Sequence, residues 1–133
     1  MKDREIRQLL ETSRIVAVVG LSDKPDRASY QVAAYLQRNG YRIIPVNPNV
    51  GEALGEKSYP SVDAIPEPVD IVDIFRRAEA VGPVVEEAIA AGARAVWMQL
   101  GIVNEEAAEA ADAAGLQVVM DRCIQIEHAR LLK

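Results

Sequence analysis

Cysteine and histidine are almost absent from this sequence of 133 residues, which holds one of each, Cys123 and His128. A single cysteine forms no intrachain disulfide and rules out a Cys-rich zinc site, so we expect no metal and a reducing compartment. No segment approaches the roughly 20 apolar residues of a membrane-spanning helix. The N-terminus is charged from Lys2 to Glu11 and lacks the apolar core of a signal peptide. These absences predict a cytoplasmic protein with no membrane partner.

Basic charge is also scarce. The chain carries 15 Lys and Arg residues against 20 Asp and Glu residues, which gives a formal net charge of -5 and a pI near 4.9. Because no block of Lys or Arg offsets this balance, we expect no nucleic-acid partner. A few cations beside a helix N-terminus can still form a local site for a small anion. The charge balance therefore does not exclude an anionic small molecule as a ligand.

Aromatic residues make up only 5% of the chain while half of it is apolar, so the core must consist of aliphatic side chains. Five short, nearly continuous apolar runs rich in β-branched residues predict parallel strands. They cover residues 15–19, 42–46, 69–74, 95–98 and 117–120. Helical patterns lie between most of them, at residues 3–11 and 29–38, from Gly82 to Gly92, from Asn104 to Gly115, and at 124–132. Residues 48–68, which contain several prolines, predict a long connection with one helical turn near 62–65.

This alternation predicts one α/β domain over residues 1–133, a Rossmann-like three-layer domain with a five-stranded, mostly parallel sheet flanked by helices. In such sheets the ligand crevice lies at the carboxyl ends of the strands. After the first strand, Gly20 stands where a dinucleotide-binding turn begins, but the later glycines of that fingerprint are missing. Ser22, Lys24, Arg27 and a helix N-terminus take their place, which suits a pyrophosphate. A solvated loop with incidental charges is the alternative.

The second and third strands end in further candidates. Val46, Asn47 and Pro48 stand where an NAD domain places a ribose-binding carboxylate. An amide at Asn47 can bond a ribose without repelling a phosphate on it, although Asn-Pro also makes simple turns. Phe75 and Arg76 follow the third strand, where an arginine meets either a ligand phosphate or a neighbouring acid.

Three single residues are candidates for a catalytic role. Asp73 falls within a buried strand, so we expect it to hydrogen-bond to a nearby N–H group or arginine, with an acid of perturbed pKa as the alternative. Cys123 and His128 are five residues apart, share no helix face and have no catalytic or metal-ligating companion. We therefore expect both to be structural, with a mixed disulfide between Cys123 and a ligand thiol as a minor alternative.

Several separated motifs resemble one family. They are Val18-Val19-Gly20-Leu21-Ser22 with Lys24-Pro25 and Arg27, Pro45-Val46-Asn47-Pro48, Val69 to Arg76, Ala95 to Gly101, and Asp121-Arg122-Cys123-Ile124. The chain resembles the stand-alone CoA-binding domain proteins of bacteria and archaea, which are similar to the N-terminal CoA-binding domain of the succinyl-CoA synthetase α subunit. The resemblance implies that Gly20, Ser22, Lys24 and Arg27 cradle the CoA phosphates. It places Val46, Asn47 and Pro48 near the adenosine, with Phe75 and Arg76 lining the cleft.

The resemblance implies a module that binds coenzyme A or an acyl-CoA without catalysis, because the sequence ends at Lys133 without the phosphohistidine domain of a synthetase. Two alternatives stay open: an NAD(P)-binding redox or sensor domain, and a small enzyme that acts on an acyl-CoA. A second copy of the chain or a docking protein is also a possible partner.

Overall fold

The computed structural model describes all 133 residues and is built around a five-stranded sheet in the order β2-β1-β5-β6-β7. Its strands are β1 (Ile15–Val19), β2 (Arg42–Val46), β5 (Ile71–Ile74), β6 (Ala95–Met98) and β7 (Gln117–Val119). Every pairing in this sheet is parallel. The α/β class, the five strands and the Rossmann-like arrangement predicted from the apolar runs are confirmed.

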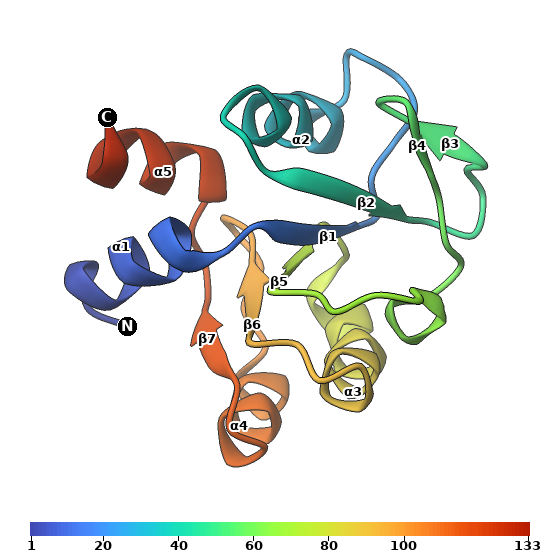
Figure 1. Ribbon diagram of the computed structural model, residues 1–133. Helices are drawn as coiled ribbons and strands as arrows, with labels where there is room; N and C mark the ends of the chain where they lie inside the picture. Colours follow the sequence, from blue (N-terminus) through green and yellow to red (C-terminus); the bar gives the residue numbers. More distant parts are fainter.

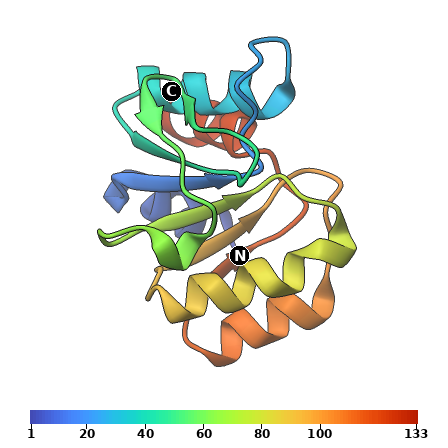
Figure 2. The same ribbon diagram turned by 90° about the vertical axis from the view of Figure 1, so that its right-hand side faces the viewer.

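Helices cover both faces of the sheet (Figure 1). One layer holds α1 (Asp3–Thr12), α2 (Ala28–Arg38) and α5 (Ile124–Leu132), and the other holds α3 (Val81–Ala90) and α4 (Glu105–Ala113). Figure 2 shows α2 and α5 on one side of the sheet and α3 and α4 on the other. No helix has the length and apolar character that crossing a membrane would require.

Two apolar clusters separate the sheet from its helices. Side chains alternate along each strand, so Val16 and Val18 pack toward α1, α2 and α5, whereas Ala17 and Val19 pack toward α3 and α4. Ile71 and Trp97 belong to the first group and are fully buried. Because both faces of every central strand are covered, the strands read as continuous apolar runs in the sequence.

The segment predicted as a long connection contains a small hairpin that sequence reasoning missed. Its strands β3 (Glu52–Ala53) and β4 (Glu56–Lys57) pair antiparallel. Leu54 and Gly55 join them, both with positive φ, as a two-residue hairpin turn requires. Leu-Gly is not one of the usual sequence signals of such a turn. The single helical turn expected near residue 62 is present as a 3-10 helix, η1 (Val62–Ala64).

Several element boundaries also differ from the prediction by one or two residues, and two of these differences have a clear structural setting. β5 begins at Ile71 and not at residue 69, although the Asp70 N–H still donates to the Ile15 carbonyl at 3.0 Å. Helix α3 begins at Val81, directly after the short 3-10 helix η2 (Ala78–Ala80), so that Pro83 is its third residue. Proline is tolerated there because the first-turn N–H groups have no partner within the helix.

The strand order fixes where a ligand crevice can lie. From β1 the chain crosses to β2 on one side, and it later returns to β5 on the other side of β1. The connections leaving β1 and β5 therefore diverge, and this topological switch point opens a crevice at the carboxyl ends of these two strands. The segments after Val19 and Ile74 face each other across it, with the Phe75 N–H donating to the Val19 carbonyl at 2.8 Å.

Candidate functional site

A hollow of about 330 Å³ lies at this switch point, between the β1–α2 loop and the end of β5. Most of the residues proposed from the sequence to hold phosphates meet there. Its lining consists of Gly20, Ser22, Lys24, Arg27, Ala28, Ser29 and Phe75. Residues from two strand ends and one helix N-terminus are thus brought together, as expected for the carboxyl edge of a parallel sheet.

Gly20 is required by the way the β1–α2 loop passes the end of β5. Its φ is +87°, and a Cβ atom at this position would lie 2.2 Å from the Phe75 carbonyl oxygen and 2.9 Å from the Arg76 Nη1 atom. The first contact is with backbone, which cannot move aside. Glycine therefore lets the two strand ends approach, and this approach places the Arg76 guanidinium against the loop.

The N-terminus of α2 points its free donors into the hollow. No side chain caps this helix end, and the first intrahelical bond is donated by the Gln31 N–H to the Arg27 carbonyl. The N–H groups of residues 28–30 are available to an anion, as is the positive end of the helix dipole, whereas the Arg27 N–H donates to the Lys24 carbonyl at 3.1 Å. The loop itself is internally bonded: the Ser22 N–H donates to Ser29 Oγ, and the Lys24 N–H donates to Ser22 Oγ, each at 3.1 Å. The Ser22 hydroxyl proton remains a donor.

Two cations that line the hollow, and a third beside Gly20, form no ion pair. Lys24 and Arg27 are exposed, Arg76 is half-buried, and none of them forms a salt bridge. The neighbouring Arg77, by contrast, pairs with Glu79 at 3.4 Å and is strongly exposed. The same loop also carries two exposed acids, Asp23 and Asp26, so the three cations give this end of the sheet only a small local excess of positive charge in a chain whose net charge is -5.

The segment after β2 lies at the same edge, but most of its polar groups form hydrogen bonds within the protein. The Val46 side chain is buried in the core and its carbonyl accepts the Gly20 N–H at 2.8 Å, so only its backbone can face a ligand. The Asn47 amide donates to the Leu21 carbonyl at 3.1 Å, and its Oδ1 accepts the Asn49 N–H at 3.0 Å. Asn47 therefore holds the first and second loops together. Pro48 is exposed beside it.

The prediction for Asp73 is wrong. This side chain is fully buried and neither carboxyl oxygen has a hydrogen-bond partner. It lies between Val18 and Trp97 in the register of the neighbouring strands, and the Trp97 indole N–H donates elsewhere, to the Arg122 carbonyl. Burial raises the pKa of Asp73 well above its usual value. The carboxylate that does bond across the sheet is Asp70, which accepts the Arg14 and Ile15 N–H groups at 2.8 and 3.0 Å.

The two residues that suggest catalysis lie outside the hollow. His128 is buried and its Nδ1 lies 2.9 Å from the Tyr35 hydroxyl, so it packs α5 against α2 as a structural residue. Cys123 is half-buried at the N-cap position of α5. It is more accessible than the core cysteine expected from the sequence, because it ends the β7–α5 loop at the same carboxyl edge.

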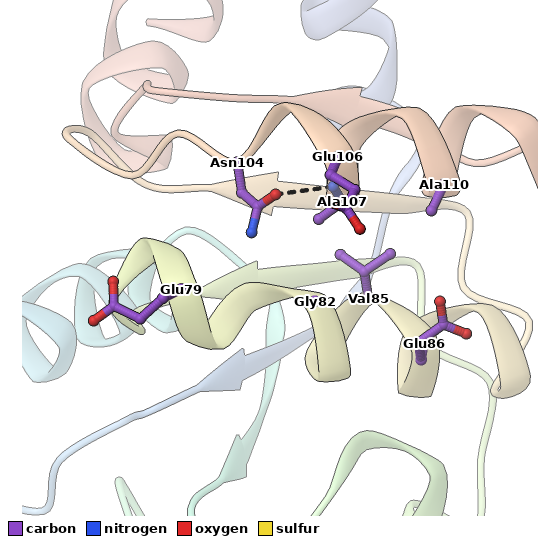
Figure 3. A pocket seen from close by; sticks show the side chains of 8 residues that line it. All are labelled: Glu79, Gly82, Val85, Glu86, Asn104, Glu106, Ala107 and Ala110. Carbon is purple, nitrogen blue, oxygen red and sulfur yellow. Dashed lines mark hydrogen bonds between the residues drawn. The ribbon is translucent and has the colours of Figure 1, made fainter.

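A second hollow, of about 290 Å³, lies between α3 and α4 on the other layer (Figure 3). Glu79, Glu86 and Glu106 surround its apolar floor, while Asn104 caps α4 by accepting the Ala107 N–H at 2.9 Å. Since no cation lines this groove, it repels a phosphate. The β1–α2 hollow is the better candidate for an anionic ligand.

A parallel sheet with a loop-to-helix anion site at its switch point defines a Rossmann-like nucleotide-binding domain. Comparison with known proteins specifies the family: the family model described as "CoA binding domain" matches residues 14–129. The chain therefore belongs to the CoA-binding domain family, and the resemblance drawn from its separated motifs is confirmed.

Relatives include both small proteins and large ligases. "Uncharacterized protein YneT" of Bacillus subtilis is 48% identical over 94% of this chain and 93% of its own. A "hypothetical protein from Pyrococcus horikoshii OT3" has a solved structure with a TM-score of 0.97 at 44% identity, covering 100% of this chain and 94% of its own. The ADP-forming acetate–CoA ligase I of Archaeoglobus fulgidus is 30% identical over 84% of this chain, which spans 18% of the ligase. This relative is an acetate–CoA ligase, so it supports the resemblance to the succinyl-CoA synthetase α subunit only loosely.

Proposed function

We propose that this protein binds coenzyme A in the crevice between β1 and β5, as a binding module with no chemistry of its own. The diphosphate lies on the N-terminus of α2, bonded by free N–H groups and the Ser22 hydroxyl, with Lys24, Arg27 and Arg76 around it. The adenosine lies toward β2, beside Asn47 and Pro48. The observation that carries this proposal is an uncapped helix end at the switch point, lined by two unpaired cations, Lys24 and Arg27, with Arg76 beside Gly20.

Family membership supports coenzyme A over other nucleotides. The sequence at the crevice agrees, because Asn47 stands where an NAD domain places an acid on its ribose, and a neutral amide tolerates the 3′-phosphate of CoA. The lack of chemistry is proposed because the titratable side chains that line the hollow, Lys24 and Arg27, are suited to holding phosphate and not to proton transfer at a thioester.

The test is calorimetric titration of ligand-stripped protein with CoA, dephospho-CoA and NAD. We expect CoA to bind most tightly and dephospho-CoA to bind more weakly. Replacing Lys24 or Arg27 by Ala should weaken CoA binding about tenfold each, since each removes roughly 1.5 kcal/mol of charge-assisted contact with phosphate.

Arg38→Ala supplies the matched control. Arg38 is also exposed and also free of ion pairs, but it lies in the last turn of α2, about 15 Å from the helix N-terminus. It changes the net charge by the same amount and should leave CoA affinity within about twofold, since exposed charges beyond a Debye length are screened. Equal losses in all three variants, or tighter binding of NAD than of CoA, would overturn the proposal.

A further inference from the structure

Exposed apolar side chains gather at one end of the carboxyl edge. Apart from Met1, the large hydrophobic residues that stand exposed are Leu100 (63%), Ile126 (57%) and Val103 (44%). Leu100 and Ile126 come from different segments, the β6–α4 loop and the first turn of α5, yet they line one hollow of about 180 Å³ together with Cys123. Asp121, Arg122 and Glu127 complete its wall. Neither the fold nor the phosphate site accounts for this exposure.

The walls of this hollow are held in place by hydrogen bonds between the two loops. The Gly101 N–H donates to Asp121 Oδ1 at 2.6 Å, which joins the loop after β6 to the loop after β7. The Trp97 indole N–H donates to the Arg122 carbonyl at 2.8 Å, and the Ile124 N–H donates to Gln99 Oε1 at 3.1 Å. The hollow is therefore formed before any ligand arrives, which lowers the cost of binding there.

This inference rests on the proposed function, which places the CoA diphosphate at the N-terminus of α2. From there the ligand is long enough to reach this hollow. With the diphosphate beside β1 and the adenosine toward β2, the pantetheine arm crosses the carboxyl ends of β5 and β6. Strands lie about 4.8 Å apart, so β7 is about 14 Å from β1. The arm has the backbone length of about four extended residues, which is also roughly 14 Å. Its sulfur thus arrives at the mouth of the hollow.

The charges that line the hollow favour an uncharged acyl group on the CoA sulfur. Its cation, Arg122, already donates to Glu127 Oε1 at 2.6 Å, and Glu127 is held again by Arg130 at 2.9 Å. The lining contains two carboxylates against this single paired cation. A carboxylate on the acyl group would find no free positive partner, whereas an aliphatic chain would cover Leu100 and Ile126.

We propose that the Leu100–Ile126 hollow binds the acyl chain of a short, uncharged aliphatic acyl-CoA, so that the protein recognises the acyl group as well as the coenzyme. The test compares CoA, acetyl-CoA, butyryl-CoA and succinyl-CoA by calorimetric titration under reducing conditions. A fully buried methylene is worth about fourfold in affinity. We expect butyryl-CoA to bind at least fivefold more tightly than CoA, and succinyl-CoA to bind about tenfold more weakly than butyryl-CoA.

Two variants locate the effect. Ile126→Gln should reduce the ratio of butyryl-CoA to CoA affinity to below about twofold, whereas Val103→Gln, an equivalent change at an exposed residue outside the hollow, should preserve the wild-type ratio. Equal binding of CoA and butyryl-CoA by the wild-type protein would overturn the inference while leaving the proposed function intact, as would an unchanged ratio in Ile126→Gln. Failure of the wild-type protein to bind CoA at all would overturn both.

Discussion

Replacing Asp73 by Asn should stabilise the protein, and by an amount that grows with pH. Burial raises the pKa of the folded-state carboxyl above the unfolded value of 3.8. Above that pH the unfolded chain releases its proton while the folded protein keeps it, so the free energy of unfolding falls as pH rises. The slope is about 1.4 kcal/mol per pH unit for as long as the folded carboxyl stays protonated. Asn carries no such proton and removes this slope.

Urea unfolding at pH 5 and pH 7 measures the effect. The difference in the free energy of unfolding between Asp73→Asn and the wild-type protein should increase by up to about 2.7 kcal/mol from pH 5 to pH 7. It should be measured as a higher urea midpoint for the variant at an unchanged m-value. Asp70→Asn is the matched control on the same segment, because Asp70 accepts two backbone N–H groups and its replacement should not stabilise. A pH-independent difference, or a less stable Asp73→Asn protein at pH 7, would refute the assignment of Asp73 as a protonated, unpartnered carboxyl.

Three further substitutions test other parts of the structure. Burial, with Lys133 nearby, lowers the pKa of His128, so the contribution of this side chain to the free energy of unfolding should fall as pH falls below about 6.5. In urea unfolding, the stability of His128→Phe relative to the wild-type protein should therefore rise as pH falls through this range; a difference that does not change with pH would contradict it. Gly20→Ala forces a Cβ to within 2.2 Å of the Phe75 carbonyl oxygen, so thermal unfolding should show a loss of at least about 2 kcal/mol, and CoA titration should show lost binding. Glu127→Gln removes the negative charge and one of the two acceptor oxygens that bond Arg122 and Arg130 and should cost about 1–3 kcal/mol, since both arginines are half-exposed; no loss would show that the network is only a surface feature.

The sequence predicts the sheet well because its strands are buried on both faces. Ile71 to Ile74 form an apolar run broken only by Asp73. The glycines that follow the helices, and Asn104 before α4, mark helix ends by local rules that the structure follows. The β3–β4 hairpin escapes prediction because two-residue strands have no periodicity, and their pairing depends on the Leu54-Gly55 turn.

The meeting of the proposed phosphate-binding residues was predictable for a different reason: strand order brings the residues after each strand to one edge. Gly20, Ser22, Lys24 and Arg27 of one loop therefore line a hollow together with Phe75, which is distant in the sequence. Asp73 and Leu100 were not predictable, because the partner of a buried acid and the exposure of an apolar residue depend on what three-dimensional packing places over them. A buried polar residue normally has a partner, and that rule failed here.

The distribution of charge explains how an acidic protein can hold an anionic ligand. The α3–α4 layer is rich in carboxylates, among them Glu86, Glu106 and Glu109, and these face away from the β1–α2 hollow across the sheet. Lys24 and Arg27 line the hollow and Arg76 lies beside Gly20, all three without an ion pair. The exposed Asp23 and Asp26 of the same loop oppose them, so attraction for an anion must come mainly from the cations and free N–H groups that it contacts directly. A site built in this way depends on local donors and not on net charge, which is why composition alone excludes nucleic acid without excluding a diphosphate.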